Sequence, residues 1–297
     1  MQIYESEKGM SLAQSGIERG FQMVRFLDRE IGNLERKVVL DIGCGLGGIT
    51  LALAERCRMV VGMDHDIPHR LSIFQKRLKE RRCRNIVAIA ADCLNLPFRP
   101  KTFDLILMNG VLEWLGESNG SRPPMEIQGA VLESICRLLK DSGVLYLAIE
   151  NRYYPANAVI DPHARLPLVA FLPRAFASVV SQLLSKKPYR THIYSYWGLK
   201  RLLARAGFHH QEFFVPMTNY YYPYELVSIE DRRGMIAALA KFPVGCLTPE
   251  YIAQVRGRYG YFKWKYLHLV TRLGLLKLLC HSFIVLCGKD RCGGTYA

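Results

Sequence analysis

A glycine-rich turn after a short apolar segment constrains the fold of this chain more than any other feature. Residues 41–47 read Asp-Ile-Gly-Cys-Gly-Leu-Gly and directly follow the apolar residues 38–40. Glycines at this spacing let the main chain turn tightly and approach a ligand closely. The pattern predicts a strand, a turn and a helix, with the free N–H groups at the helix start facing a polar ligand.

The segments around this turn alternate between strand and helix patterns up to residue 150. Strands are predicted at 38–43, 59–63, 85–91, 103–108 and 144–150, and helices at 11–36, 48–57, 68–81 and 126–139. Such alternation predicts a parallel sheet covered by helices on both faces, an α/β architecture. After residue 150 the rhythm is interrupted by prolines. It then resumes with a helix at 196–206, capped by Ser195, and strands at 208–215 and 282–289.

Acidic side chains end two further predicted strands. Asp64 ends the second strand, 21 residues after Gly43. In nucleoside-binding sheets an acid at this place accepts hydrogen bonds from ribose hydroxyls. Asp92 ends the third strand, where a carboxylate could meet an adenine amino group. Together with Asp41, these acids predict one nucleoside-binding crevice at the carboxyl ends of the strands.

With this glycine run and these acids, the chain resembles the class I S-adenosylmethionine-dependent methyltransferases. The resemblance is strongest over about residues 37–150. The resemblance implies that the glycine run holds the methionine part of the cofactor, Asp64 the ribose and Asp92 the adenine. His65 stands where the family usually has an apolar residue, and its ring can still stack on adenine. The implied cofactor-binding set, with no metal site, is Asp41, Gly43, Cys44, Gly45, Gly47, Asp64, His65, Asp92, Cys93 and Asn109.

The resemblance also implies a Rossmann-like fold, with a seven-stranded, mostly parallel sheet in the order 3-2-1-4-5-7-6 and an antiparallel last strand. It divides the chain into six parts. These are an N-terminal helical lead (1–36), a cofactor-binding core (37–150), a cap insertion (151–192), a core helix and strand (193–216), a second cap insertion (217–280) and a last strand with a tail (281–297).

Charge separates the two halves of the chain. The net charge is +14, yet residues 1–150 carry 20 basic and 19 acidic side chains while residues 151–297 carry 20 and 7, and 14 of the 16 tyrosines lie in the second half. Basic and aromatic side chains suit phosphates, carboxylates, sugars or an anionic membrane surface. The cationic candidates for holding an anionic acceptor are Arg152, Arg165, Arg174, Lys186, Lys187 and Arg190, with a solvated basic face as the alternative.

Methyl transfer to a hydroxyl can use a general base, and three residues are candidates. They are Glu113, His163 and His192, of which His163 is preferred. For His163 the plainer interpretation is a solvent-facing loop histidine. The leading hypothesis is an O-methyltransferase acting on an anionic or glycan-type small molecule under a basic, Tyr-rich cap.

Two other functions remain open, an RNA methyltransferase and a non-catalytic interaction module. Residues 262–280 mix apolar and basic side chains as an interfacial membrane helix would, although a core-facing cap helix is the preferred interpretation. The apolar stretches are interrupted by prolines and charges, and residues 1–8 do not resemble a secretory signal. Nine cysteines without a C-x-x-C pair favour reduced thiols. We therefore expect a cytoplasmic protein, with peripheral contact to the inner membrane face as an option.

Overall fold

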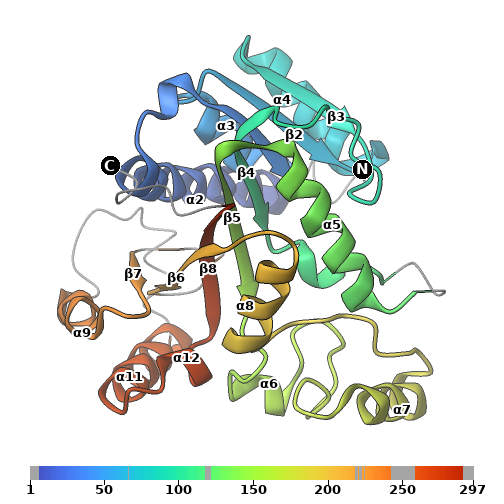
Figure 1. Cartoon of the computed structure of the whole chain (residues 1–297), viewed down its shortest axis with the longest axis vertical. Coiled ribbons are helices and arrows are strands. Elements are labelled where there is room, and N and C mark those ends of the chain that lie inside the picture. Colours follow the sequence, from blue (N-terminus) through green and yellow to red (C-terminus); the bar gives the residue numbers. More distant parts are fainter. Residues whose placement is uncertain are drawn as a thin grey trace.

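The computed structural model describes residues 7–65, 67–117, 122–217, 220, 223, 225–241 and 258–289. Its centre is an eight-stranded sheet (Figure 1). The strands are β1 (Val38–Ile42), β2 (Met59–Asp64), β3 (Ile86–Ala90), β4 (Phe103–Asn109), β5 (Leu139–Glu150), β6 (His210–Pro216), β7 (Leu226–Ser228) and β8 (Ser282–Gly288). They lie in the order β3-β2-β1-β4-β5-β8-β6-β7.

The order of the seven predicted strands is confirmed, because β8 is the predicted last strand and pairs antiparallel with both β5 and β6. The predicted count of seven is wrong by one. β7 pairs antiparallel with β6 at the sheet edge, inside the segment assigned to the second cap insertion. Only three residues long, it is too short for an alternating pattern to reveal it.

Helices cover both faces of the sheet, since neighbouring strand residues point to opposite sides. Leu105 and Leu107 of β4 belong to the core beneath α2 (Glu7–Ile31) and α3 (Gly48–Ala54). Ile106 and Met108 belong to the core beneath α5 (Pro124–Leu138) and α8 (Tyr196–Arg205). The expected N-terminal lead is thus a covering helix, followed by the short helix η1 (Leu34–Arg36).

Several shorter elements differ from the predicted helices or add detail to them. The predicted helix at 68–81 is divided into a π-helical turn, η2 (Ile67–Leu71), and α4 (Ser72–Arg81). After β4 the chain forms a short 3-10 turn, η3 (Leu112–Trp114). The predicted cap of α8 is confirmed, because the main-chain N–H of Gly198 donates to Ser195 Oγ at 3.2 Å.

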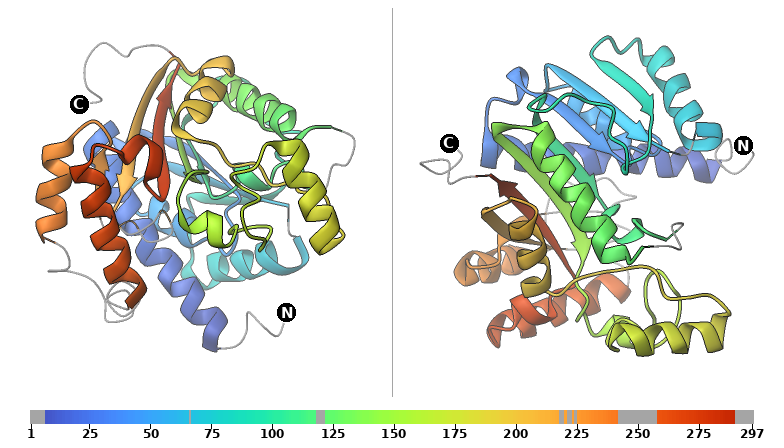
Figure 2. Two further views of the ribbon diagram at one scale, coloured as in Figure 1. Left: turned by 90° about the horizontal axis from the view of Figure 1, so that it is seen from below. Right: turned by 45° about the vertical axis from the view of Figure 1, so that its right-hand side comes forward.

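Two groups of helices lie beyond the carboxyl end of β5, at the lower end of the molecule in Figure 1. α6 (Ala156–Val159) and α7 (Arg174–Ser185) follow β5, and α9 (Arg232–Lys241), α11 (Arg258–Arg272) and α12 (Leu276–Leu279) lie between β7 and β8. Viewed from below, α6 lies between α7 and the α11–α12 pair (Figure 2).

One face of α11 lies against the rest of the chain, as the preferred interpretation of residues 262–280 requires. Leu267 and Val270 are buried, and Trp264 Nε1 donates to the main-chain oxygen of Leu239 at 3.0 Å. No helix among the described residues is long and apolar enough to cross a membrane. The seven cysteines within the described ranges are all free.

Candidate functional site

The glycine-rich loop joins β1 to α3 through three residues with left-handed main-chain angles. Gly43, Gly45 and Gly47 have φ values of 74°, 55° and 75°. A Cβ on Gly47 would lie 1.9 Å from Cδ2 of Phe74, so the loop can approach α4 only without a side chain there. The N–H groups of Gly43 and Cys44 donate to Met63 O at 2.8 and 3.0 Å, which ties the loop to β2.

Two buried aspartates fix this loop from inside. Asp41 accepts a hydrogen bond from Thr50 Oγ1 at 2.6 Å, which links the end of β1 to the first turn of α3. Burial raises the pKa of Asp41 to about 6, against the opposing effect of the Thr50 hydrogen bond. Asp64 Oδ2 accepts from the N–H of Gly45 at 2.9 Å. The predicted ribose acid is therefore in direct contact with the predicted methionine loop.

The other predicted cofactor residues line the same strand ends. Asp92 is exposed after β3, and its Oδ1 accepts from the N–H of Leu94 at 3.0 Å. Burial raises the pKa of the neighbouring Cys93 to about 12, so this thiol stays neutral. The ring of His65 is largely exposed and open to stacking. At the end of β4, Asn109 has a buried Oδ1 without a hydrogen-bond partner among the described residues.

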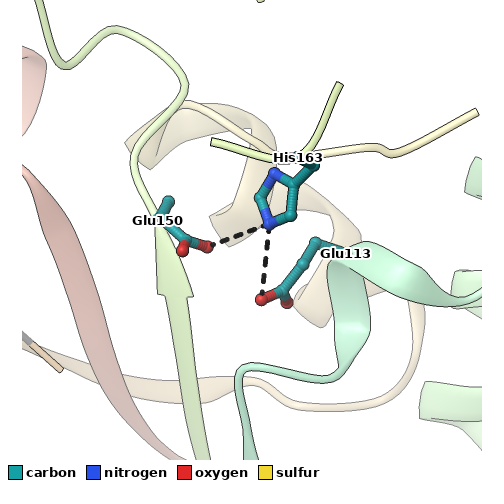
Figure 3. A group of neighbouring side chains, drawn as sticks. All are labelled: Glu113, Glu150 and His163. Atoms are coloured by element: carbon teal, nitrogen blue, oxygen red, sulfur yellow. Dashed lines mark ion pairs between the residues drawn. The ribbon is translucent and has the colours of Figure 1, made fainter. Parts of the chain in front are cut away.

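A second group of side chains gathers at the carboxyl ends of β4 and β5. Glu113 lies on η3, Glu150 ends β5, and His163 comes from the cap segment between α6 and α7 (Figure 3). His163 Nε2 lies 3.9 Å from Glu113 Oε1 and 3.7 Å from Glu150 Oε2. The side chain of His163 is 3% exposed and that of Glu113 is fully buried. The expected alternative of a solvent-facing His163 is therefore wrong.

Most polar atoms of this group lack hydrogen bonds. Both carboxylate oxygens of Glu113, Oε2 of Glu150 and Nδ1 of His163 are buried without a hydrogen-bond partner in the described ranges. Buried polar atoms are nearly always paired, and leaving one unpaired costs about 1–3 kcal/mol. This group, which we call the Glu–His centre, is therefore suited to a polar ligand that donates protons or carries positive charge.

Hydrogen bonds behind the Glu–His centre hold its members in place. The buried Gln128 of α5 donates to the main-chain oxygens of Leu112 and His192, at 2.7 and 3.0 Å, which joins η3 to the cap. Asp161 accepts from the N–H of His163 at 2.9 Å, which positions the loop that carries the imidazole.

Tyr220 and Val111 connect the Glu–His centre to the cofactor side. Tyr220 donates to Glu150 Oε1 at 2.8 Å, and a Cβ on Gly110 would lie 2.9 Å from its ring. The next residue, Val111, lies against the glycine loop, where its Cγ2 would be 2.5 Å from a Cβ on Gly43. The chain of contacts from Glu150 to the glycine loop is thus short.

The charges of the Glu–His centre are interdependent. Burial lowers the pKa of His163, but the charges of Glu113, Glu150 and Asp161 outweigh it, so the net shift is upward. Burial and the charge of Glu113 raise the pKa of Glu150 to about 7. Protons can therefore be redistributed within this group near neutral pH.

The ring of His192 makes different contacts from those of the Glu–His centre. Its ring stacks on Tyr194, with ring centroids 4.5 Å apart. Burial, and then the charges of Arg174 and Arg152, lower its pKa to about 3. No ion pair between the described residues joins its ring to Glu113. One of the three candidate bases therefore has its ring outside the Glu–His centre.

Three of the predicted anion-binding cations are directed to the chain itself. Arg152 Nε donates to Ala170 O at 2.6 Å, and Arg190 Nε donates to Gly116 O at 2.8 Å. Arg174 donates to the main-chain oxygen of Thr191 at 2.5 Å. The contacts of Arg152 and Arg174 hold the first cap insertion together, and that of Arg190 joins it to the segment after η3. Of the six predicted cations, Arg165, Lys186 and Lys187 are exposed.

Glu150 was not among the predicted site residues, although its place in the sequence gave a usable signal. Glu150 ends a predicted strand in the same manner as Asp64 and Asp92, and its carboxylate reaches the centre for that reason. Glu113, Glu150 and His163 each offer one ligand atom, and these atoms lie within 4.8 Å of one another. The same set could therefore hold a divalent cation, which the sequence did not lead us to expect.

The sheet order, the glycine loop held by a strand-end acid and the cap over the ends of β4 and β5 define the class of this domain. The chain contains a class I S-adenosylmethionine-dependent methyltransferase domain, a type of enzyme domain whose cofactor is S-adenosylmethionine. Residues 33–173 match the family model described as a methyltransferase domain.

Relatives with curated names agree with this class. The chain is 33% identical over 114 residues to a cypemycin N-terminal methyltransferase of Streptomyces sp, which covers 38% of this chain and 42% of that protein. It is 26% identical over 182 residues to a demethylmenaquinone methyltransferase of Lactiplantibacillus plantarum, which covers 59% and 71%. The match spans less than half the length of the first two curated relatives, 43% and 42%.

Solved structures share the fold at low identity. A phosphoethanolamine N-methyltransferase 2 of Haemonchus contortus, solved with phosphomonomethylethanolamine and S-adenosylhomocysteine, is 16% identical with a TM-score of 0.53, covering 91% of this chain and 52% of that one. The [4+2]-cyclase SpnF is also 16% identical, with a TM-score of 0.51 and coverage of 90% and 80%. The fold alone therefore does not specify which reaction follows.

Proposed function

We propose that this chain transfers the methyl group of S-adenosylmethionine to a hydroxyl of a small molecule, with the Glu–His centre as the acceptor of the hydroxyl proton. The observation that carries the proposal is that Glu113 and His163 have buried side-chain atoms without a hydrogen-bond partner among the described residues, beside the strand ends that hold the cofactor loop. A hydroxyl group donates one hydrogen bond and would satisfy one of these atoms.

The reaction balances without another reagent. The acceptor oxygen forms a bond to the methyl carbon as the bond from that carbon to the sulfonium sulfur breaks. The hydroxyl proton passes to the centre, and S-adenosylhomocysteine and a methyl ether leave. His163 is the preferred base, because Glu113 and Glu150 stabilise the imidazolium that forms. A positioned base contributes about 10²–10⁴-fold to rate.

For the acceptor we infer a glycan-type or other acidic small molecule. Trp114 lies beside the centre, edge-on to the His163 ring at 4.7 Å, and is 42% exposed, so its indole offers a face for a sugar ring. Recognition of an acidic group falls to the exposed Arg165, two residues after His163, because Arg152, Arg174 and Arg190 are held by carbonyls.

The first test measures the cofactor and then the product. Calorimetric titration with S-adenosylmethionine and S-adenosylhomocysteine should give micromolar binding that Asp64→Ala weakens strongly, because Asp64 supports both loop and ribose. Cofactor with a labelled methyl group should then label an acidic glycan or sugar-nucleotide fraction. Failure of well-folded protein to bind either cofactor would refute the enzyme proposal.

Three further outcomes would redirect the assignment. Label appearing in RNA, with affinity that falls steeply as salt rises, would favour the RNA alternative. Cofactor binding without transfer to any fraction would favour a non-catalytic module. Activity lost on chelation and restored by a divalent cation would reassign Glu113, Glu150 and His163 from proton acceptance to metal binding.

A further inference from the structure

The outward face of α7 is apolar and uncovered. Phe176, Val179, Leu183 and Leu184 are between 57% and 76% exposed. The opposite face is used, because Ala177 belongs to a small buried cluster with Val169 and Tyr189. In both Figure 1 and Figure 2, α7 lies at an outer corner of the molecule, away from the sheet. Soluble monomers rarely expose a contiguous apolar face without a use for it.

The segment before this helix also carries exposed apolar side chains. Val159 and Ile160 at the end of α6 and Leu168 before α7 are also exposed. The exposed apolar groups of the first cap insertion therefore number seven, and all lie within residues 159–184. This concentration distinguishes the α7 face from single exposed apolar residues, which are common on any protein surface.

Charge on the same segment has one sign. Residues 151–192 contain six arginines and lysines and a single acidic residue, Asp161. Asp161 is fully buried, so residues 151–192 have no exposed carboxylate side chain. Lys186 and Lys187 follow α7 directly and are exposed, as is Arg165 on the preceding loop. The apolar face thus has a cationic rim.

We propose that the α7 face docks on an anionic lipid bilayer. An interfacial helix inserts apolar side chains below the headgroups and keeps lysines at their level, and binding strengthens with anionic lipid. α7 combines these features, with Phe176, Leu183 and Leu184 as the inserting groups and Lys186 and Lys187 as the headgroup contacts. The charge around the face favours a bilayer as its partner. An anionic lipid surface is complementary to a rim of lysines and arginine without exposed acids, whereas an apolar protein partner would not require such a rim.

The test uses sedimentation of the full chain with vesicles. The protein should bind mixed phosphatidylcholine–phosphatidylglycerol vesicles and bind pure phosphatidylcholine vesicles several-fold more weakly. The double variant Leu183→Glu/Leu184→Glu should lower the partition coefficient by about tenfold or more for each leucine lost. The variant Lys186→Gln/Lys187→Gln should lower it roughly fivefold per lysine, on anionic vesicles only.

A matched control lies on another cap helix. Leu269 and Leu273, at α11 and its end, are 56% and 60% exposed. Leu269→Glu/Leu273→Glu introduces the same charge on surfaces of similar exposure and should leave binding unchanged. Thermal unfolding of each variant confirms that it is folded.

Several results would overturn the proposal. Absence of binding to anionic vesicles would do so, as would equal loss in the α7 and α11 variants. A wild-type dimer that the Leu183→Glu/Leu184→Glu variant converts to monomer would assign the face to a second copy of the chain instead. None of these readouts requires methyl transfer, so the proposal is tested separately from the proposed function.

Discussion

On the cofactor side, Asp41, Asp64 and Asp92 each accept a hydrogen bond from the chain itself. On the cap side, Glu113 has two buried carboxylate oxygens without a hydrogen-bond partner among the described residues, and Glu150 has one. The two regions are adjacent and both are lined by strand-end acids. They differ in how far the protein satisfies those acids before any ligand is present.

This difference has a physical consequence. A carboxylate that already accepts an N–H, as Asp64 does from Gly45, keeps its loop in the geometry that a cofactor needs. A buried carboxylate without a partner is costly unless it gains a proton or a ligand. The cofactor side is therefore pre-organised, whereas in the Glu–His centre several buried polar atoms lack hydrogen bonds, which the proposed proton-donating acceptor would supply.

The largest effect should come from the centre, and it is a direct way to break this comparison. We expect His163→Asn to reduce the rate of methyl transfer by about 10²–10⁴-fold, because the hydroxyl proton loses its acceptor. S-adenosylmethionine affinity should stay unchanged in calorimetry, because the cofactor loop does not depend on the imidazole. Single-turnover transfer of a labelled methyl group is the measurement.

His192→Asn is the matched control for that variant, since His192 lies on the same cap but stacks on Tyr194 outside the centre. Its rate should stay near that of the wild type. If both variants lost activity equally, a general effect of the cap would replace the base role.

Pre-organisation of the loop is tested by a change at Gly47. Gly47→Ala puts a Cβ within 1.9 Å of the Phe74 ring at a φ of +75°, which combines a clash with main-chain strain. We expect a loss of about 3–4 kcal/mol in the free energy of unfolding, together with lost cofactor binding. Urea denaturation with and without S-adenosylhomocysteine measures both.

Gly45→Ala provides the contrast. Gly45 also has a positive φ, +55°, but a Cβ there would have no neighbour within 4 Å. Its cost should be limited to the strain of the main chain, about 1 kcal/mol. Equal losses at both glycines would show that close packing against Phe74 is not what fixes the loop.

The sequence predicted the cofactor side better than the cap, for a physical reason. Gly43, Asp64 and Asp92 lie at strand ends, and strand ends are visible as local patterns of apolar residues and glycine. The order of seven strands followed from the resemblance. In the Glu–His centre, by contrast, His163 is 50 residues from Glu113 in the chain. Their proximity depends on tertiary contacts such as those of Gln128 with Leu112 and His192.

The basic residues show the limit of composition. Six cap cations were candidates for binding an acceptor anion, yet Arg152 and Arg174 donate to main-chain carbonyls inside the cap insertion, and Arg190 donates to one outside it, that of Gly116. A count of charges does not reveal which main-chain carbonyls need a hydrogen-bond donor. That depends on the course of the main chain through the prolines and turns between residues 151 and 192. β7 was not predicted because a strand of three residues is too short to show an alternation of apolar and polar side chains.

A pH titration sharpens the comparison on the cofactor side. Burial raises the pKa of Asp41 from 3.8 to about 6, so the folded state favours its protonated form. Its contribution to stability should be complete below about pH 4 and should be lost as pH rises through 6. The loss amounts to roughly 3 kcal/mol, since one pKa unit corresponds to about 1.4 kcal/mol.

Asp41→Asn removes this titration. Urea denaturation of the wild type and the variant on both sides of this pH interval gives the difference in unfolding free energy at each pH. That difference should shift in favour of the variant as pH rises. A difference that stays constant with pH would mean that Asp41 is solvated or paired more strongly than its contacts indicate.

A smaller effect than that of Asp41 concerns Thr50, whose hydroxyl donates to the Asp41 carboxylate. Thr50→Val keeps the shape of the side chain but removes the 2.6 Å hydrogen bond from Oγ1 to Asp41. At neutral pH, where Asp41 is ionised, we expect a loss of about 1.5–2 kcal/mol in unfolding free energy. Below the pKa of Asp41 the loss should shrink, because a neutral carboxyl accepts a weaker hydrogen bond. Denaturation at the same two pH values provides the measurement. A loss that is equal at both would show that Thr50 acts through packing alone, and the cofactor side would then hold an unsatisfied acid as the Glu–His centre does.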